Sequence, residues 1–326
     1  MTGPILQITD LKVEFPGLVR NVRALRGVDL VLHKGQIVGL VGESGSGKSL
    51  TALACLGLVP NSGRVSGSIM LDGFEVVGRG ELELGRLRGG VAAMIFQNPM
   101  RALNPFFTVG QQMVEVIRCH RPFGRTEAVE AASEGLRDVQ MPDPEIALGK
   151  YPHQMSGGQI QRVMIALGLA CRPRLLIADE CTTALDVTVQ AQILVLLREL
   201  TVSHDLSVLF ITHDLSVVAT VCDRVAVMYA GEVVENGSVT DVFADPLHPY
   251  TRKLMSTVPT LGRAGGELES IRGQVPDLAL PLTGCTFCDR CDDALDVCAA
   301  TPPGMRRYRA DHQAACHDTA RRMDVE

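Results

Sequence analysis

The chain has few aromatic residues and no excess of positive charge. Its 326 residues include no Trp, only 4 Tyr and 9 Phe, and the formal net charge is −6. Proteins that bind single-stranded nucleic acid stack the bases on aromatic side chains, and nucleic-acid-binding surfaces in general are basic. The composition offers neither feature, so we expect no nucleic acid among the partners.

Long apolar runs are missing as well. No stretch of about 18 uninterrupted apolar residues occurs, which is the length that a membrane-spanning helix requires. Residues 1–10 also lack the basic segment and apolar core of a secretory signal. We therefore expect a cytosolic chain that depends on other chains for any pore. With 46% hydrophobic residues, the chain can form one large α/β domain and a small appended one.

A glycine-rich loop stands between a strand-like segment, Ile37–Val41, and a helix-like one, Leu50–Leu58. It reads G-E-S-G-S-G-K-S and matches the pattern G-x-x-x-x-G-K-[ST]. In this pattern backbone N–H groups and a helix N-terminus surround phosphate oxygens. Lys48 would reach the β- and γ-phosphates, and the Ser49 hydroxyl would ligate Mg²⁺. The predicted nucleotide-binding residues are Gly42, Glu43, Ser44, Gly45, Ser46, Gly47, Lys48, Ser49 and Leu50.

A second apolar run, Leu175–Ala178, ends in two acidic residues. The run is too apolar for a surface loop and predicts a central parallel strand. Asp179 would then stand at the carboxyl end of the strand, where open α/β sheets bind ligands, and would support Mg²⁺ directly or indirectly. Glu180 would follow beside the γ-phosphate of a bound nucleoside triphosphate.

The segment Met155-Ser156-Gly157-Gly158-Gln159 lies between these two motifs and precedes a helical pattern. Ser156 is a candidate N-cap, and the glycines permit a phosphate to approach the helix N-terminus closely. In this order the three motifs resemble those of the ATP-binding cassette (ABC) ATPases. The resemblance implies that Ser156–Gln159 of one cassette close over ATP held by a second cassette. It also implies that Glu180 polarises the attacking water.

The resemblance assigns roles to three further segments. Gln97 has the Q-loop position, where Gln contacts Mg²⁺ and the attacking water. Ala184-Leu185-Asp186 is similar to the D-loop that crosses the dimer interface. His213 follows a strand-like run and matches the switch histidine, which hydrogen-bonds the γ-phosphate. The catalytic candidates are Glu180, His213 and Gln97.

Two positions depart from the family pattern, and one family feature is hard to place. Cys181 stands where relatives usually have Pro, and Met155 replaces a Leu; we expect no loss of chemistry from either. Members of the family stack an aromatic residue on adenine, and Phe15 is the only aromatic residue before the phosphate loop. A core Phe at a strand end explains Phe15 equally well, so both interpretations stay open.

The order of elements predicts an α/β fold, an ABC-type P-loop NTPase over residues 1–245. Leu6–Gly35 predicts antiparallel strands, and strand and helix alternate from Gln159 towards a terminal hairpin at Tyr229–Gly237. A helical subdomain is expected at about 98–158, with helical spacing over Val109–Arg118 and Thr126–Val139. The sheet core should therefore be parallel, with an antiparallel β subdomain beside it.

Asn98–Pro105 follows Gln97 directly and resembles the segment of peptide-importer cassettes that receives the permease coupling helix. The alternative is a Pro-rich connector. We favour docking, because a loop joined to Gln97 can relay the position of a permease to the active site.

Residues 246–326 resemble the tail of oligopeptide and dipeptide importer ATPases. The markers are His248-Pro249-Tyr250-Thr251, Gly273–Leu278 and a cysteine cluster. Of the ten cysteines, five are scattered through the cassette and are expected to be small buried hydrophobic residues. These five are Cys55, Cys119, Cys171, Cys181 and Cys222.

The other five cysteines favour a metal site, since a reducing compartment disfavours disulfides. The subfamily pattern uses Cys285, Cys291, Cys298 and Cys316, and some members bind a [4Fe–4S] cluster there. Four thiolates also suit Zn²⁺, and a tail without metal is a third alternative. Cys288 is extra to the pattern and could offer an alternative ligand. A structural role is expected, because a short tail gains stability from a metal; a redox sensor is an alternative.

The resemblance implies the ATP-hydrolysing subunit of a peptide-type ABC importer. Its expected partners are a second ABC ATPase subunit, two transmembrane permease subunits and an extracytoplasmic substrate-binding protein. The chain would be peripheral, at the cytoplasmic face of the inner membrane. Di- and oligopeptides are the expected cargo, with nickel chelates, glutathione and D-amino-acid dipeptides left open. The alternative is a soluble, non-transport ABC ATPase of DNA repair or translation, but no heptad run or second cassette with basic linkers occurs.

Overall fold

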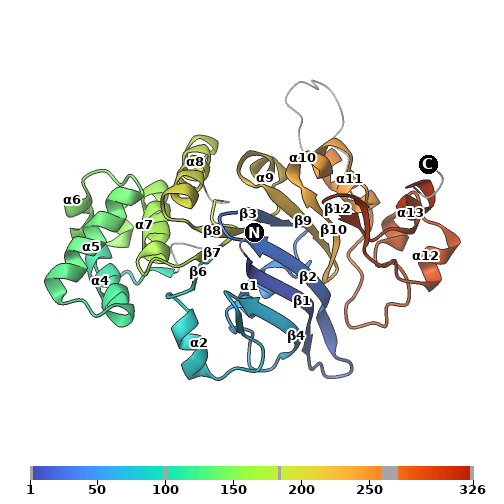
Figure 1. Ribbon diagram of the computed structural model, residues 1–326, viewed down its shortest axis with the longest axis horizontal. Helices are drawn as coiled ribbons and strands as arrows, with labels where there is room; N and C mark the ends of the chain where they lie inside the picture. The colour runs from blue at the N-terminus through green and yellow to red at the C-terminus, as the bar shows by residue number, and fades with distance from the viewer. Residues whose placement is uncertain (1–2, 98–101, 183–184, 258–270, 324–326) are drawn as a thin grey trace. The chain divides into compact units, whose positions relative to one another are not determined.

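The computed structural model describes residues 3–97, 102–182, 185–257 and 271–323 (Figure 1). The chain forms two compact units, each assembled from separate stretches of sequence. The first unit comprises Met1–Ile5, Leu32–Ile37 and Arg79–Phe210, and the second comprises Leu6–Val31, Val38–Gly78 and Ile211–Glu326.

Most of one antiparallel sheet belongs to the second unit. Its strand order is β2-β1-β4-β5, and β1 pairs with β4 from Leu6↔Leu71 to Glu14↔Arg64. Apolar side chains alternate with polar ones along β1 and β2, so each strand buries one face, as the sequence predicted. The strands are β1 (Pro4–Phe15), β2 (Val22–His33), β4 (Arg64–Leu71) and β5 (Phe74–Glu75).

The second unit also holds five strands in the order β11-β12-β10-β9-β3. Strand β3 runs parallel to β9, and β9 and β10 form the expected hairpin. The tail extends the sheet beyond this hairpin, because β12 pairs with β10 through Glu235↔Ala314. The tail strand uses hydrogen-bonding groups that an edge strand would leave unpaired. The strands are β3 (Ile37–Val41), β9 (Arg224–Tyr229), β10 (Glu232–Ser238), β11 (Arg306–Arg309) and β12 (His312–Ala314).

The helices of the second unit begin with α1 (Lys48–Cys55), which starts inside the glycine-rich loop. It ends earlier than the sequence predicted, because Gly57 adopts a φ of 62° and turns the chain away. Tyr229, Tyr250 and Phe287 lie in an apolar core that joins the sheet to the tail. The other helices are α9 (Leu215–Val221), α10 (Val239–Ala244), α11 (Pro249–Ser256), η2 (Cys288–Arg290), α12 (Asp296–Ala300) and α13 (His317–Met323).

The first unit contains three strands in the order β8-β7-β6. Strands β6 and β7 are parallel, from Ala92↔Leu175 to Ile95↔Ala178. Every residue of β7 is buried, which confirms the predicted central strand. Gly168 of α7 lies against side chains of β6 and β7 and allows this helix to pack closely on the sheet. These elements are β6 (Ala92–Ile95), β7 (Leu175–Asp179), β8 (Ser207–Thr212), α7 (Gly157–Leu169) and α8 (Val187–Ser203).

The predicted helical insertion is present in the first unit. Helix α4 buries Val109, Met113 and Ile117, which are four residues apart and share one face. Figure 1 shows α4, α5, α6 and α7 side by side; α4 contacts the other three, and α5 also contacts α6 and α7. The remaining elements are α2 (Glu81–Leu87), α4 (Val109–His120), α5 (Arg125–Asp138), α6 (Pro144–Gly149) and η1 (Pro152–Gln154).

The cysteines outside the tail are not all buried. Cys55 and Cys181 are, and burial raises the pKa of each thiol to about 12. Cys119 is exposed, so the prediction of a small buried hydrophobic residue is wrong for it. It lies on α4 away from the face that packs on the other helices. Cys171 and Cys222 are only partly buried.

Candidate nucleotide and catalytic site

The glycine-rich loop joins the buried strand β3 to α1 in the second unit. Gly42 has a φ of 153°, and a Cβ there would lie 2.1 Å from the carbonyl oxygen of Met228, so no other residue fits. The backbone N–H of Gly231 donates to the carbonyl oxygen of Ser46 (3.0 Å), which ties the loop to the β9–β10 turn. The neighbouring hairpin therefore fixes both ends of the loop.

Lys48 is buried, and its ammonium group points back into the loop. The Nζ atom donates to the carbonyl oxygens of Gly42 (2.8 Å) and Glu43 (2.9 Å). Ser44 and Ser49 are exposed. This arrangement combines backbone N–H groups and an ammonium group, which bind phosphate, with a hydroxyl at the start of α1, whose oxygen can ligate Mg²⁺.

In the first unit, the structure brings two predicted catalytic residues together. Gln97 Nε2 donates to Glu180 Oε2 at 2.5 Å. Glu180 directly follows Asp179, which is only 4% exposed at the carboxyl end of β7. The amide of Gln97 therefore fixes the direction of the Glu180 carboxylate.

The predicted N-cap at Ser156 is confirmed. Its Oγ accepts from the N–H of Gln159 (3.4 Å), and Gln159 Oε1 accepts from the N–H of Ser156 (3.1 Å). These reciprocal bonds form a capping box at the start of α7. A Cβ on Gly158 would lie 2.8 Å from Val189 Cγ1, so this glycine lets α8 approach the motif.

The D-loop candidate lies next to this motif in the first unit. Asp186 caps α8 by accepting from the N–H of Val189 (2.9 Å), and a Leu185 methyl lies 3.7 Å from where Gly157 would carry a Cβ. Ala184 lies outside the described residues. The signature and D-loop segments therefore share one packing contact.

His213 and Phe15 belong to the second unit. His213 is exposed immediately after β8, and Asp214 next to it caps α9 by accepting from the N–H of Ser216 (2.9 Å). Phe15 is half-buried, and its ring lies 2.8 Å from the position of a Cβ on Gly63. That contact fits the interpretation of Phe15 as a packing residue, and adenine stacking stays a prediction.

Cysteines of the tail influence one another. Burial is the main cause that raises the pKa of Cys285 to about 12, and Cys298, Cys316 and Cys291 raise it further. Burial likewise raises the pKa of Cys291 to about 11, with additional effects from Cys316 and Cys298. Within the described ranges, no three His, Cys, Asp or Glu side chains converge as ligands of one metal ion.

Two tail residues that contact the phosphate loop are not predicted as site residues by the sequence. Tyr250 belongs to the motif that begins the tail, and Arg290 belongs to no motif. Both bind Glu43. No sequence pattern predicts these contacts, because Arg290 and Glu43 are 247 positions apart.

The fold, the phosphate loop, the capped S-G-G-Q helix and the strand ending in Asp-Glu define an ATP-binding cassette. Residues 25–183 match the ABC transporter family, and residues 234–298 match the oligopeptide/dipeptide transporter C-terminal region. The chain is 49% identical over 315 residues to a probable peptide ABC transporter ATP-binding protein, y4tR, of Sinorhizobium fredii, covering 96% of this chain and 94% of the relative. It is 46% identical over 312 residues to the oligopeptide transport ATP-binding protein OppD of Escherichia coli, covering 96% and 92%.

The chain therefore belongs to the ATP-binding subunits of ABC transporters, in the group with the oligopeptide/dipeptide C-terminal region, and it is an ATPase. A dimeric structure of the cassette MJ0796, in a post-hydrolysis state bound to ADP and Pi, matches with a TM-score of 0.62 and 26% identity. That match covers 72% of this chain and 98% of the other. Among the described residues, none of the helices is both long and apolar enough to cross a membrane.

Proposed function

We propose that this chain drives the import of di- and oligopeptides by hydrolysing ATP at the cytoplasmic face of the inner membrane. The observation that supports this function is the similarity over 96% of the chain to peptide-transport ATP-binding proteins. Since that similarity includes the tail as well as the cassette, it favours a peptide importer over a soluble ATPase of DNA repair or translation. The cassette would span residues 1–245 and the tail 246–326.

The phosphate loop would bind the triphosphate of ATP. Lys48 would contact the β- and γ-phosphates, and residues Gly42 to Leu50 would surround them with backbone N–H groups. Mg²⁺ would be held by Ser49 and Gln97 with support from Asp179, and it would neutralise phosphate charge. Phe15 is the candidate for adenine stacking.

Glu180 would polarise the attacking water. Its hydrogen bond from Gln97 supports this role, because a general base must be oriented toward the proton it accepts. His213 would hydrogen-bond the γ-phosphate. Positioning and charge neutralisation lower most of the barrier to phosphoryl transfer, so the carboxylate adds to a reaction that the phosphate loop already favours.

A second ABC subunit would complete the site. Ser156, Gly157, Gly158 and Gln159 at the N-terminus of α7 would close over ATP held by that partner, whose own motif would close over the ATP bound here. The matching MJ0796 cassette is dimeric, which supports this arrangement. Two permease subunits and an extracytoplasmic binding protein would complete the importer.

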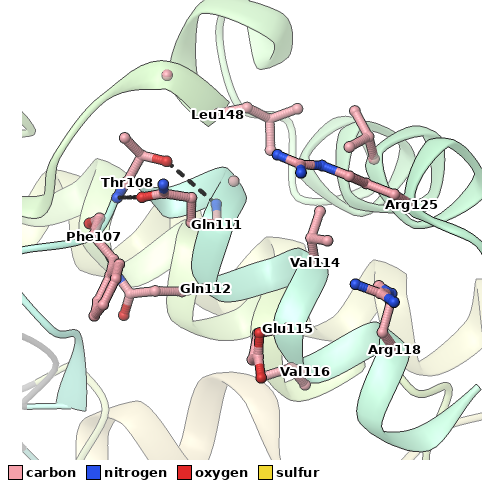
Figure 2. A pocket seen from close by; sticks show the side chains of 13 residues that line it. Phe107, Thr108, Gln111, Gln112, Val114, Glu115, Val116, Arg118, Arg125 and Leu148 are labelled. Atoms are coloured by element: carbon pink, nitrogen blue, oxygen red, sulfur yellow. Dashed lines mark hydrogen bonds between the residues drawn. The ribbon is translucent and has the colours of Figure 1, made fainter.

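A surface of the helical region supports docking of the permease. Residues 98–101 of the predicted docking segment lie outside the described residues, but its remainder leads into Phe106 and Phe107, which are 84% and 50% exposed. Phe107 also lines a groove of about 950 Å³, and Figure 2 shows Phe107, Val114 and Leu148 among its walls. Exposed aromatic residues beside an apolar groove are typical of protein interfaces.

The tail would hold a [4Fe–4S] cluster through Cys285, Cys291, Cys298 and Cys316. Among the described side chains, no three His, Cys, Asp or Glu converge as ligands of one metal ion, so the geometry favours neither metal. Four thiolates suit Zn²⁺ as well as an iron–sulfur cluster. We favour iron–sulfur because the four positions match those of tails in this subfamily that carry such a cluster, and the match to the oligopeptide/dipeptide C-terminal region supports the comparison.

Transport assays in vesicles test the function. The chain is combined with its permeases and a second ATPase subunit, and ATP-dependent accumulation of a labelled dipeptide or oligopeptide is measured. We expect import that depends on ATP and on Glu180. Cofractionation with ribosomes or DNA in place of membranes and permeases would contradict the proposal and favour the soluble alternative.

A further inference from the structure

The tail contacts the phosphate loop through one arginine. Arg290 ends η2, between Cys288 and Cys291, and its side chain is 6% exposed. Its Nη1 lies 2.7 Å from Oε2 of Glu43 and its Nη2 lies 3.0 Å from Oε1. Glu43 is the second residue of the phosphate loop. A bidentate ion pair, the most directional kind between these side chains, therefore joins the tail to the loop.

Arg290 is held in place independently of Glu43. Its Nε donates to the carbonyl oxygen of Arg272 (2.9 Å), and its Nη1 also donates to the Tyr229 hydroxyl (3.2 Å). Lys253 Nζ in turn donates to the carbonyl oxygen of Arg290 (2.7 Å). The guanidinium plane is thus oriented by the tail and the sheet before it meets the carboxylate, which a lysine could not reproduce.

A second tail residue holds the backbone of Glu43. The hydroxyl of Tyr250 on α11 accepts from the N–H of Glu43 at 2.8 Å. Tyr250 is fully buried, and its ring lies 4.7 Å from that of Tyr229 and 5.4 Å from that of Phe287. The tail therefore binds Glu43 twice: Arg290 binds its carboxylate, and Tyr250 binds its N–H.

The position of Glu43 also influences that of Lys48. The carbonyl oxygen of Glu43 accepts from Lys48 Nζ at 2.9 Å. The other carbonyl acceptor of this ammonium group is that of Gly42 (2.8 Å), so a shift of Glu43 would displace one of the two backbone acceptors that orient it. A loop fixed in advance loses less conformational entropy when it binds a ligand, so its affinity is higher.

We propose that Arg290 and Tyr250 are positioning residues for the phosphate loop, which hold Glu43, and through its carbonyl Lys48, in the conformation that binds a nucleoside triphosphate. This inference rests on the proposed role of Lys48 in ATP binding. It gives the tail a part in nucleotide affinity that is separate from any metal it carries.

The test is a double-mutant cycle on the full chain with Glu43→Gln, Arg290→Gln and the double variant. The dissociation constant of a non-hydrolysable ATP analogue is measured for each. We expect each single substitution to raise it by about tenfold, and the double variant to be no weaker than either single one. The kcat of Arg290→Gln at saturating ATP should stay within about twofold, because the loop, once filled, carries the same catalytic groups.

Tyr250→Phe provides a second variant that keeps the aromatic packing. It removes only the acceptor for the Glu43 N–H, and it should raise the dissociation constant several-fold. If Arg290→Gln fails to fold, the results for Tyr250→Phe and Glu43→Gln decide the matter. Unchanged affinity in both would overturn the proposal.

Arg309→Gln is the matched control. Arg309 is also a tail arginine in an ion pair, with Asp245, but it is 44% exposed, and its loss should leave ATP affinity unchanged. Lys48→Ala distinguishes a failure of the phosphate-loop assignment from a failure of the positioning role of Arg290. If Lys48→Ala leaves affinity unchanged, the phosphate-loop assignment fails. If it weakens binding while Arg290→Gln lowers only the unfolding temperature, the tail is structural and the positioning role is wrong.

Discussion

Glu180 adopts a left-handed backbone conformation with a φ of 45°. Such a conformation costs a residue other than glycine about 1–3 kcal/mol and persists only where the surroundings enforce it. Here Asp179 is fixed in β7 on one side, and the Gln97 amide holds the carboxylate on the other. Backbone strain at this point supports the catalytic assignment, because it aims one carboxylate in a direction that relaxed backbone would not give.

Glu180→Gln should separate binding from hydrolysis. The substitution keeps the shape of the side chain but removes the proton acceptor, so ATP turnover should fall by about 10²- to 10⁴-fold. Affinity for the non-hydrolysable analogue should change little. Phosphate release and analogue binding measure the two effects. Glu199→Gln, an exposed position on α8, is the control, and ordinary turnover in Glu180→Gln would remove Glu180 from its role.

We expect His248 to make the stability of the tail depend on pH. Its Nδ1 accepts from the N–H of Tyr250 (3.0 Å) as the cap of α11, and burial lowers the pKa of the imidazole from 6.5 to about 4. The unfolded chain therefore binds this proton more readily than the folded one. The stability contributed by the neutral imidazole is complete above pH about 6.5 and decreases as the pH falls toward about 4, by on the order of 3 kcal/mol.

The measurement for His248 is the free energy of unfolding between pH 7 and pH 4. His248→Asn is the matched variant, since Asn also caps helices but does not titrate. The wild type should lose stability relative to this variant over that window. Parallel pH curves for the two proteins would contradict the prediction.

At the scale of elements, the start of α7 and the start of α8 depend on one glycine. Gly158→Ala would place a methyl group 2.8 Å from Val189 Cγ1, and we expect a loss of about 1–3 kcal/mol from overpacking. Val189→Ala in the same chain should restore much of this stability. Gly157→Ala is the control, because its nearest neighbour would be a Leu185 methyl at an ordinary 3.7 Å. Chemical unfolding compares the four proteins, and equal losses for both glycines would contradict the packing argument.

Periodicity predicted the elements whose burial follows their own sequence. The spacing of apolar residues gave α4 and α5 to within two residues, and the apolar run before Asp179 gave β7. It did not predict β12, a strand of only three residues whose stability comes from pairing with β10. A strand of three residues is too short to show an alternation of apolar and polar side chains, so its formation depends on pairing with the neighbouring strand.

At the scale of the whole molecule, the site divides into parts that sequence could and could not predict. The phosphate loop, Ser156–Gln159 and Asp179-Glu180 are contiguous motifs, and contiguity is what made them recognisable. The ion pair between Arg290 and Glu43 joins distant positions and uses residue types that are common on surfaces. Only the fold of the tail against the sheet brings them together, so no local pattern could have indicated the contact.

The composition of the tail gives the last prediction. Protein purified without oxygen should contain about four irons and four sulfides per chain and show thiolate-to-iron absorption. Cys298→Ser should lose most of the iron, since it removes a proposed thiolate ligand, while the backbone hydrogen bond from the N–H of Cys285 to the carbonyl oxygen of residue 298 (2.7 Å) remains available. Cys288→Ser is the matched control in the same segment and should keep the iron. If Cys288→Ser loses iron while Cys298→Ser retains it, Cys288 and not Cys298 is the ligand. One zinc per chain without iron would contradict the cluster.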